Sequence, residues 1–190
     1  MIKLTIQSIK QTLLWTLVAG ILYPLGITAI SQICFHHQAN GSLIRNDHEI
    51  IGSVLLAQRF QDPRYFWPRP SAGSYATVPS GASNLGPTSA VLQTNVTTNV
   101  SSLLAAHQKP ANTPVPADLV FTSGSGLDPH ISPEAARFQV ARVATARNFT
   151  AQELDALVDR FIEPSQWGFL GEPRVNVLLL NLELDHLQQK

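Results

Sequence analysis

Residues 122–133, with the sequence TSGSGLDPHISP, include the residue types that most suggest ligand chemistry. Ser123, Gly124, Ser125 and Gly126 precede an expected helix start, where their backbone N–H groups could bind an anion such as a nucleotide phosphate. A Walker loop would also need a Lys and a Ser or Thr after its last glycine, and a dinucleotide fingerprint would need a third spaced glycine. Asp128 would repel a phosphate. The pattern therefore favours the alternative, a strand-to-helix turn in which glycines supply unusual backbone angles.

Other polar residues form weaker groupings. His36 and His37 are adjacent, but no helix-spaced third ligand accompanies them, so we expect no metal site. Arg69 lies close to Trp67, where it could stack on the indole or bind a partner carboxylate, or it could simply pack its loop. No set of nucleophile, base and orienting residue is evident. The sequence predicts no catalytic residues.

A long apolar segment lies near the N-terminus. Residues 11–44 contain no Lys, Arg, Asp or Glu, and residues 12–35 would form about 36 Å of helix, enough to cross a bilayer core. A cleaved signal peptide would have an apolar core of about 7–15 residues that ends in small residues. We therefore expect residues 12–35 to form a permanent transmembrane helix that contacts the lipid bilayer, with Pro24 kinking it.

One side of this helix differs from the other. At 100° per residue, small and polar residues fall within an arc of about 140°, and leucines cover the opposite side. Helices associate in lipid by close approach at small residues, so we expect this arc to meet a partner helix. The alternative is that small residues are simply common in spanning helices. The arc contains Thr16, Ala19, Gly20, Tyr23, Gly26 and Ser31, together with Ile27 and Ile30.

Charge placement predicts the orientation of the helix. Lys3 and Lys10 precede it, whereas Arg45 is the only Lys or Arg in the twenty residues that follow it. The positive-inside rule then places residues 1–11 in the cytoplasm and the rest of the chain, after about residue 36, outside. The single cysteine, Cys34, can form no internal disulfide.

The part of the chain after the helix is nearly neutral. It holds 11 of the 13 Lys and Arg residues and all 13 Asp and Glu residues, a net charge of −2. No basic patch for nucleic acid is expected. A chain of 190 residues, 44% of them hydrophobic, allows one modest domain beside the helix.

Residues 36–49 are expected to be a linker and residues 50–190 the domain. Residues 50–58 form a compact apolar run that indicates a buried strand. A 26-residue loop with five prolines follows at 62–87. Because so long a loop is unusual in a compact domain, we expect it to be pinned to the domain or to a partner.

Further elements follow from local signals. Pro87 and recurring apolar residues indicate a helix that ends near His107. Ser132 and Pro133 indicate the start of a second helix. Thr150 and Glu153 form a capping box, which indicates the start of a third helix. Strands are expected at 117–122 and 175–184, with helices at about 87–107, 132–148 and 150–162. The resulting order, β-α-β-α-α-β, predicts a small mixed α/β extracytoplasmic domain after a single N-terminal transmembrane helix.

Six stretches, in order, cover nearly the whole chain and together resemble one protein family. They read GILYPLGITAISQ, QANGSLI, GSVLLAQRF, YFWPRPSA, SGASNLGPTS and SGSGLDPHISPEAARFQVARVATARN. The chain resembles the KdpC family, the C subunits of bacterial Kdp potassium-transporting P-type ATPases. Each stretch is weak alone, but the combination is specific.

The resemblance implies a single-span, non-catalytic accessory subunit needed for assembly or stabilisation of its complex, with regulation as a further role. Its partners would be the channel-forming and ATP-hydrolysing subunits. The resemblance also implies an alternative role as a catalytic chaperone that raises the ATP affinity of the hydrolysing subunit, with Gln139 touching the nucleotide. ATP is cytoplasmic, whereas the expected orientation places Gln139 outside, so the two expectations conflict.

Overall fold

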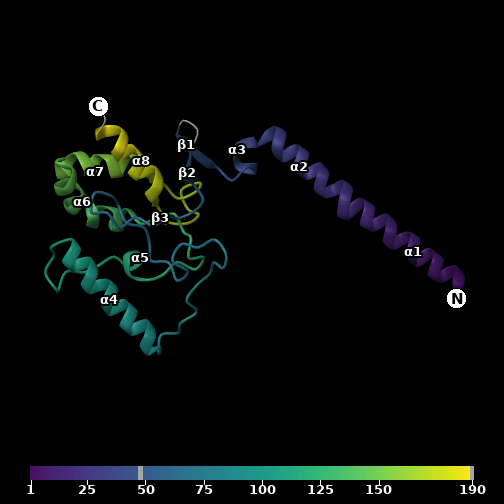
Figure 1. Cartoon of the computed structure of the whole chain (residues 1–190), viewed down its shortest axis with the longest axis horizontal. Helices are drawn as coiled ribbons and strands as arrows, with labels where there is room; N and C mark the ends of the chain where they lie inside the picture. The colour runs from purple at the N-terminus through teal and green to yellow at the C-terminus, as the bar shows by residue number, and fades with distance from the viewer. Residues whose placement is uncertain (47–48, 189–190) are drawn as a thin grey trace. The chain divides into compact units, whose positions relative to one another are not determined.

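The structure is a computed structural model that describes residues 1–46 and 49–188. The chain divides into two compact units, Met1–Leu43 and Ile44–Lys190. The first is helical and the second combines helices with short strands, as Figure 1 shows. The expected combination of one long apolar helix and a small mixed domain is therefore present.

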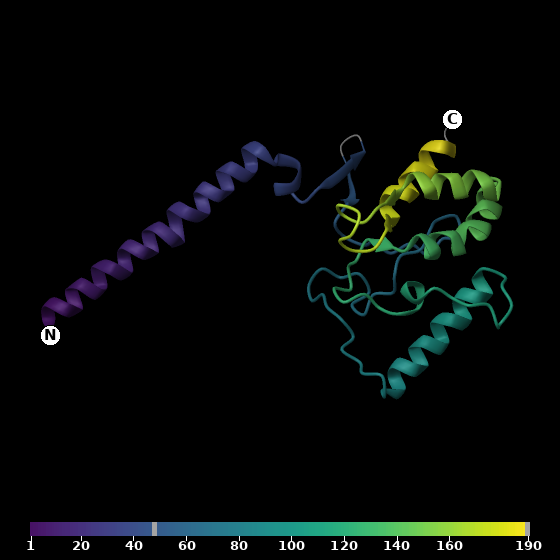
Figure 2. The same ribbon diagram turned by 180° about the vertical axis from the view of Figure 1, so that it is seen from behind.

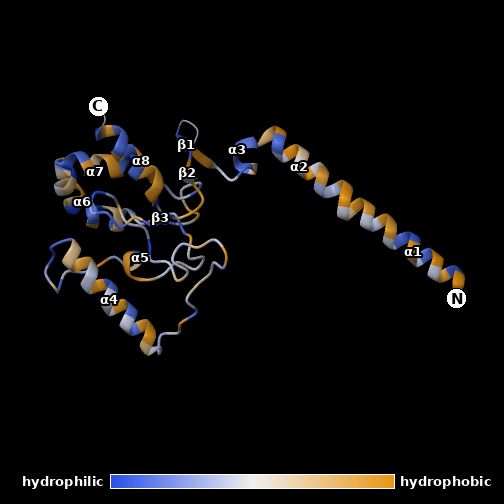
Figure 3. Ribbon diagram, viewed as in Figure 1, coloured by the Kyte–Doolittle hydropathy of each residue, from blue (hydrophilic) through white to orange (hydrophobic). Residues whose placement is uncertain are grey.

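The first unit contains a continuous helix, Ile2–Cys34, that is long and apolar enough to cross a membrane. It consists of α1 (Ile2–Leu17), a π-helical turn η1 (Val18–Leu22) and α2 (Tyr23–Cys34), and its apolar character is visible in Figure 3. Its 33 residues extend about 50 Å, and it starts ten residues before the expected residue 12.

The irregular point of the helix is the π turn that precedes Pro24, where a kink was expected. The Tyr23 N–H donates to the Val18 carbonyl, five residues earlier. Proline offers no N–H to the carbonyl four residues before it, Gly20, and its ring crowds that carbonyl. The wider π turn leaves room for the ring, which gives a physical reason for its position.

The segment expected to be a linker carries regular structure. It holds α3 (His36–Ala39) and β1 (Leu43–Asn46), and β1 pairs with β2 (Glu49–Ser53) in a two-stranded sheet. The buried strand expected at 50–58 is wrong in extent and burial. It ends at Ser53, and 56% of Ile50 is exposed.

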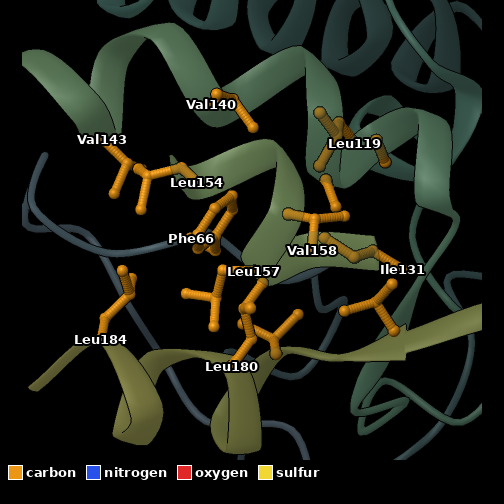
Figure 4. Close-up of a cluster of buried hydrophobic side chains, with 14 of the residues drawn as sticks. Phe66, Leu119, Ile131, Val140, Val143, Leu154, Leu157, Val158, Leu180 and Leu184 are labelled. Carbon is orange, nitrogen blue, oxygen red and sulfur yellow. The ribbon is translucent and has the colours of Figure 1, made fainter. Parts of the chain in front are cut away.

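Three helices and a small sheet enclose the core of the second unit. The helices are α6 (Pro133–Arg147), α7 (Ala151–Arg160) and α8 (Val177–Gln188). The antiparallel sheet has the order β3-β5-β4, where β3 is His130–Ile131, β4 is Ile162–Glu163 and β5 is Arg174–Asn176. In its register Ile131 and Ile162 both face Val175. Phe66, from the proline-rich loop, is buried among side chains of these helices, as Figure 4 shows.

All three expected helices are present, but only α6 and α7 start at their expected signals; α4 starts three residues after Pro87, at Ala90, where the Ser89 side chain caps it. Helix α4 spans Ala90–Ala106, and its C-terminal end, with Leu103, packs on the core, while its N-terminal end extends away from α6, α7 and α8 in Figure 2. The Ser132 hydroxyl accepts from the Ala135 N–H at 3.0 Å, and the capping box of Thr150 and Glu153 is complete. Local side chain to backbone bonds therefore set these helix starts.

Both later strand expectations are wrong. The segment expected as a strand at 117–122 contains the short helix α5 (Ala117–Val120). In the run at 175–184 only the first residues belong to β5, and α8 begins at Val177. The Asn176 side chain accepts from the Leu179 N–H at 3.2 Å, as an N-cap residue does. The predicted element order is therefore also wrong.

Candidate functional site

The backbone of residues 63–67, in the proline-rich loop, is held by side chains of α6 and α8. We call these residues the clamped segment. The Asn181 amide from α8 accepts from the Phe66 N–H at 2.8 Å and donates to the Phe66 carbonyl at 2.9 Å. One side chain thus satisfies both backbone groups of a buried residue, a role that a neighbouring strand would otherwise fill.

Gln139 from α6 forms the same clamp on the next residue. Its Oε1 accepts from the Trp67 N–H at 2.7 Å, and its Nε2 donates to the Trp67 carbonyl at 3.1 Å. Arg142 Nη2 donates to the same Oε1 at 2.9 Å, so both lone pairs of that oxygen are engaged. The side chain is 0% exposed. Contact with a nucleotide would require this amide to leave Trp67.

Two buried arginines complete the clamp. Arg142 donates to the carbonyls of Pro63 and Tyr65, and its guanidinium lies 4.2 Å from the centre of the Trp67 ring. Arg147 donates to the Arg64 carbonyl at 2.7 Å. Each of the five carbonyls of the clamped segment therefore accepts from a side chain of α6 or α8. The expectation that the loop is pinned to its domain is confirmed for this part.

His107 lies at the end of α4 against the clamp. Its Nδ1 is 2.7 Å from the Leu103 carbonyl, and its Nε2 accepts from Arg142 Nε at 3.1 Å. These partners fix the neutral tautomer with the proton on Nδ1. Burial and the charges of Arg142 and Lys109 lower the pKa of His107 to about 4, although the bond to Leu103 opposes the shift. The imidazole is neutral at physiological pH.

The glycine segment 123–126 forms a turn packed on the proline-rich loop. The Ser123 N–H donates to the Pro70 carbonyl, the Gly126 N–H to the Ser123 carbonyl and the Leu127 N–H to Ser125 Oγ. Gly126 has a φ of +71°, and a Cβ there would lie 2.9 Å from the Gly81 carbonyl oxygen. This position requires glycine both for its backbone angle and for the close approach.

The turn does not run directly into a helix. Strand β3 separates it from α6, and the carboxylate of Asp118 accepts from the Ser132 N–H at 2.6 Å at the helix start. A protein carboxylate thus already lies where an anion would bind. The turn at 123–126 packs on the proline-rich loop, whereas Gln139 bonds to Trp67 and Arg142. The two groups of residues expected to touch a nucleotide therefore make different contacts and do not form one site.

Arg69 and Asp128 form an ion pair beside this turn. Arg69 Nη1 lies 3.1 Å from Asp128 Oδ2, while Asp128 Oδ1 accepts from the His130 N–H at 3.0 Å. Burial raises the pKa of Asp128, but the bonds from His130 and the charge of Arg69 outweigh it and lower the pKa. The cation over the Trp67 indole is Arg142, and Arg69 has a different partner.

A surface cleft of 660 Å³ lies between the proline-rich loop and helices α4 and α5. None of the residues expected to touch nucleotide lines it. Within residues 1–46 and 49–188, no group of three or more His, Cys, Asp or Glu could hold a metal ion. The cleft is lined by Arg59, Phe60, Gln61, Trp67, Pro68, Pro70, Ser71, Ser74, Tyr75, Asn99, Ser102, Leu103 and Leu119.

The sequence-based reasoning missed the clamp, although a signal for it exists. Gln139 and Arg142 are three residues apart on α6, so both lie on one helix face. The buried residues Val140 and Val143 lie beside them. Polar side chains on a buried face must find partners, and an irregular proline-rich segment has backbone groups that need them. The signal indicates that a clamp exists but not which segment it holds.

Comparison with known proteins gives one consistent result. Residues 5–186 match the family described as KdpC: K+-transporting ATPase, c chain. The potassium-transporting ATPase KdpC subunit of Methylococcus capsulatus is 53% identical over 185 residues, which cover 95% of this chain and 96% of the relative. The KdpC subunit of Sorangium cellulosum is 54% identical over 91% of this chain and 92% of its own length. That of Dechloromonas aromatica is 49% identical over 96% of both chains.

Proposed function

Because this chain belongs to the KdpC family of K+-transporting ATPase c chains, we propose that it is a non-catalytic accessory subunit that stabilises its complex through the membrane helix. Its partners are the channel-forming and ATP-hydrolysing subunits. Every residue of α1, η1 and α2 is unburied within the chain, and this observation carries the proposal. A helix whose apolar surface has no cover within its own chain needs lipid and other helices around it.

The π turn changes how the small residues of the helix are arranged. It places one extra residue in its turn, which rotates the following residues by about 100° relative to an uninterrupted helix. The single arc expected from the sequence then becomes two shorter faces. Thr16, Ala19 and Gly20 form the first and Tyr23, Gly26 and Ser31 the second. We propose that both faces contact partner helices and that the leucines meet lipid.

Replacing both glycines tests this proposal. A Cβ at Gly26 would meet no atom within 4 Å, and at Gly20 the nearest is Thr16 Cγ2 at 3.9 Å. Gly20→Leu with Gly26→Leu therefore leaves the isolated helix intact but blocks close approach by a partner. We expect lower co-purification with the channel-forming subunit. The matched control, Leu17→Ile with Leu22→Ile, should assemble normally, and equal recovery of both variants at equal expression would contradict the proposal.

The proposal includes an orientation and a role for Gln139. Lys3 and Lys10 favour a cytoplasmic N-terminus and a domain outside the inner membrane. Gln139 then acts as a positioning residue that holds Trp67, because both ends of its amide are engaged there. We propose no nucleotide contact for Gln139 or for the turn at 123–126.

A further inference from the structure

A short aromatic turn projects from the domain between β4 and β5. We call Gln166–Leu170 the aromatic tip. Trp167 is 83% exposed and Phe169 is 74% exposed, and their ring centres are 6.4 Å apart. Large aromatic side chains that are this exposed in a folded domain indicate a surface that contacts a membrane or another molecule.

The backbone holds the tip in a defined and strained conformation. Gln166 and Leu170 exchange two backbone hydrogen bonds, each 2.9 Å long. Trp167 has a φ of +53°, a left-handed angle that is costly for a bulky residue, and Gly168 follows it at +82°. Such strain persists where the surrounding structure imposes it, and it is concentrated at functional positions. In this conformation the Trp167 side chain is exposed.

The tip neighbours the place where the membrane tether enters the domain. Strand β5, which follows the tip, ends at Asn176, whose Nδ2 donates to the Val54 carbonyl directly after β2 at 2.8 Å. In Figures 1 and 2 the loop that carries the tip lies beside the β1–β2 hairpin. Among residues 49–188, seven of the ten exposed large hydrophobic residues lie on β2, directly after it or on the tip: Ile50, Ile51, Leu55, Leu56, Trp167, Phe169 and Leu170.

The covalent tether limits how far this end of the domain can lie from a membrane that Ile2–Cys34 crosses. The nine residues 35–43 separate the end of α2 from the start of the second unit. Even fully extended, a chain of that length covers at most about 30 Å, and the helix α3 within it shortens this reach. Trp is enriched at the membrane–water interface, where its ring meets headgroups and acyl chains together. The residues Gln166–Leu170 carry no charge, and the exposed Glu172 lies outside the tip, so insertion of the tip buries no charged group.

We propose that the aromatic tip inserts into the bilayer interface on the side where the domain lies, and so docks the tethered domain on lipid. The inference rests on the proposed spanning role of Ile2–Cys34. The tip supplies a second, shallow attachment in addition to the span, with Trp167 and Phe169 as the inserted groups. Glu163 and Arg174, which pair at 2.9 Å at the base, stay in water.

Tryptophan fluorescence in vesicles tests the tip directly. The full chain, with Trp15→Phe and Trp67→Phe, keeps Trp167 as its single tryptophan and is reconstituted in phosphatidylcholine with or without brominated acyl chains. We expect loss of Trp167 emission in the brominated vesicles and protection from aqueous iodide. Equal emission in both vesicles, with free access to iodide, would overturn the proposal. A control with Val91→Trp and Trp167→Phe in the same background, which labels exposed α4, should show no loss.

A second probe covers the case in which Trp67→Phe fails to fold. Trp167→Cys in a Cys34→Ser background, labelled with an environment-sensitive fluorophore, retains Trp67 and should shift its emission to the blue in vesicles. An unshifted spectrum would refute lipid contact. The same probe in the assembled ATPase, if shielded from both iodide and brominated lipid, would show that a protein subunit covers the tip, which also overturns the proposal.

Alkaline extraction separates the two proposals. If the chain leaves the vesicles at high pH, the spanning role of Ile2–Cys34 fails and the tip proposal fails with it. If the chain stays while Trp167 is not quenched, only the tip proposal fails.

Discussion

Acid should destabilise the domain through His107, because its imidazole is neutral and buried at the end of α4. The side chain is 7% exposed, and Nε2 accepts from the Arg142 guanidinium. Protonation of Nε2 would direct an N–H at the N–H of Arg142 and would place a second positive charge beside the guanidinium. The pKa of His107 is therefore lowered from 6.5 to about 4.

The size and sign of the effect follow from linkage. Well above pH 6.5 His107 is neutral in both the folded and the unfolded chain, so it adds no pH dependence to the free energy of unfolding. Between pH 6.5 and 4 the unfolded chain binds a proton that the folded domain does not, so the free energy of unfolding falls as the pH falls. A pKa difference of this size corresponds to about 3 kcal/mol when complete, and to about 2 kcal/mol at pH 5. For a unit of this length, about 2 kcal/mol lowers Tm by about 4–8 °C.

The measurement compares the full chain in detergent with His107→Gln from pH 7.5 to 4.5, by thermal and urea unfolding. Gln stays neutral and carries an amide oxygen that can accept from Arg142. All other titrating groups are shared, so the difference between the two pH profiles isolates His107. We expect the wild type to lose about 2 kcal/mol more than the variant between pH 7.5 and 5. Parallel profiles, or a His107 titration near its ordinary pKa, would refute the reasoning.

Three further predictions follow from the structure. Ser80→Cys in a Cys34→Ser background should react with a membrane-impermeant maleimide in intact spheroplasts; reaction only after lysis would reverse the proposed orientation. Gln139→Ala should cost about 1–3 kcal/mol of stability, because it strips the half-buried Trp67 backbone of its partners, as Asn181→Ala should for the buried Phe66. The ATP affinity of the assembled complex should not change, and a several-fold loss with normal stability would instead support nucleotide contact. Gly126→Val should lower Tm clearly, since its Cβ would lie 2.9 Å from the Gly81 carbonyl oxygen, while Gly124→Val, with open space, should not; equal Tm values would show that the turn is not constrained.

Local signals were sufficient for part of the fold. The long apolar helix could be predicted from the length of the apolar run and its lack of charge, because an uncharged run longer than a bilayer core is typical of a membrane-spanning helix. The starts of α6 and α7 follow from Ser132 and from the pair Thr150 and Glu153, because a cap involves residues only three apart. The resemblance of six dispersed stretches to the KdpC family is confirmed by the match over residues 5–186.

Contacts distant in sequence determined the rest. The run at 175–184 is apolar throughout, so its periodicity cannot separate strand from helix, and the choice depends on Asn176 and on packing. Residues 63–67 could be expected to be pinned, but the groups that hold them, such as Gln139 and Asn181, lie 72 and 115 residues away along the chain. A buried polar side chain must find a partner, and only the tertiary structure decides which backbone it meets.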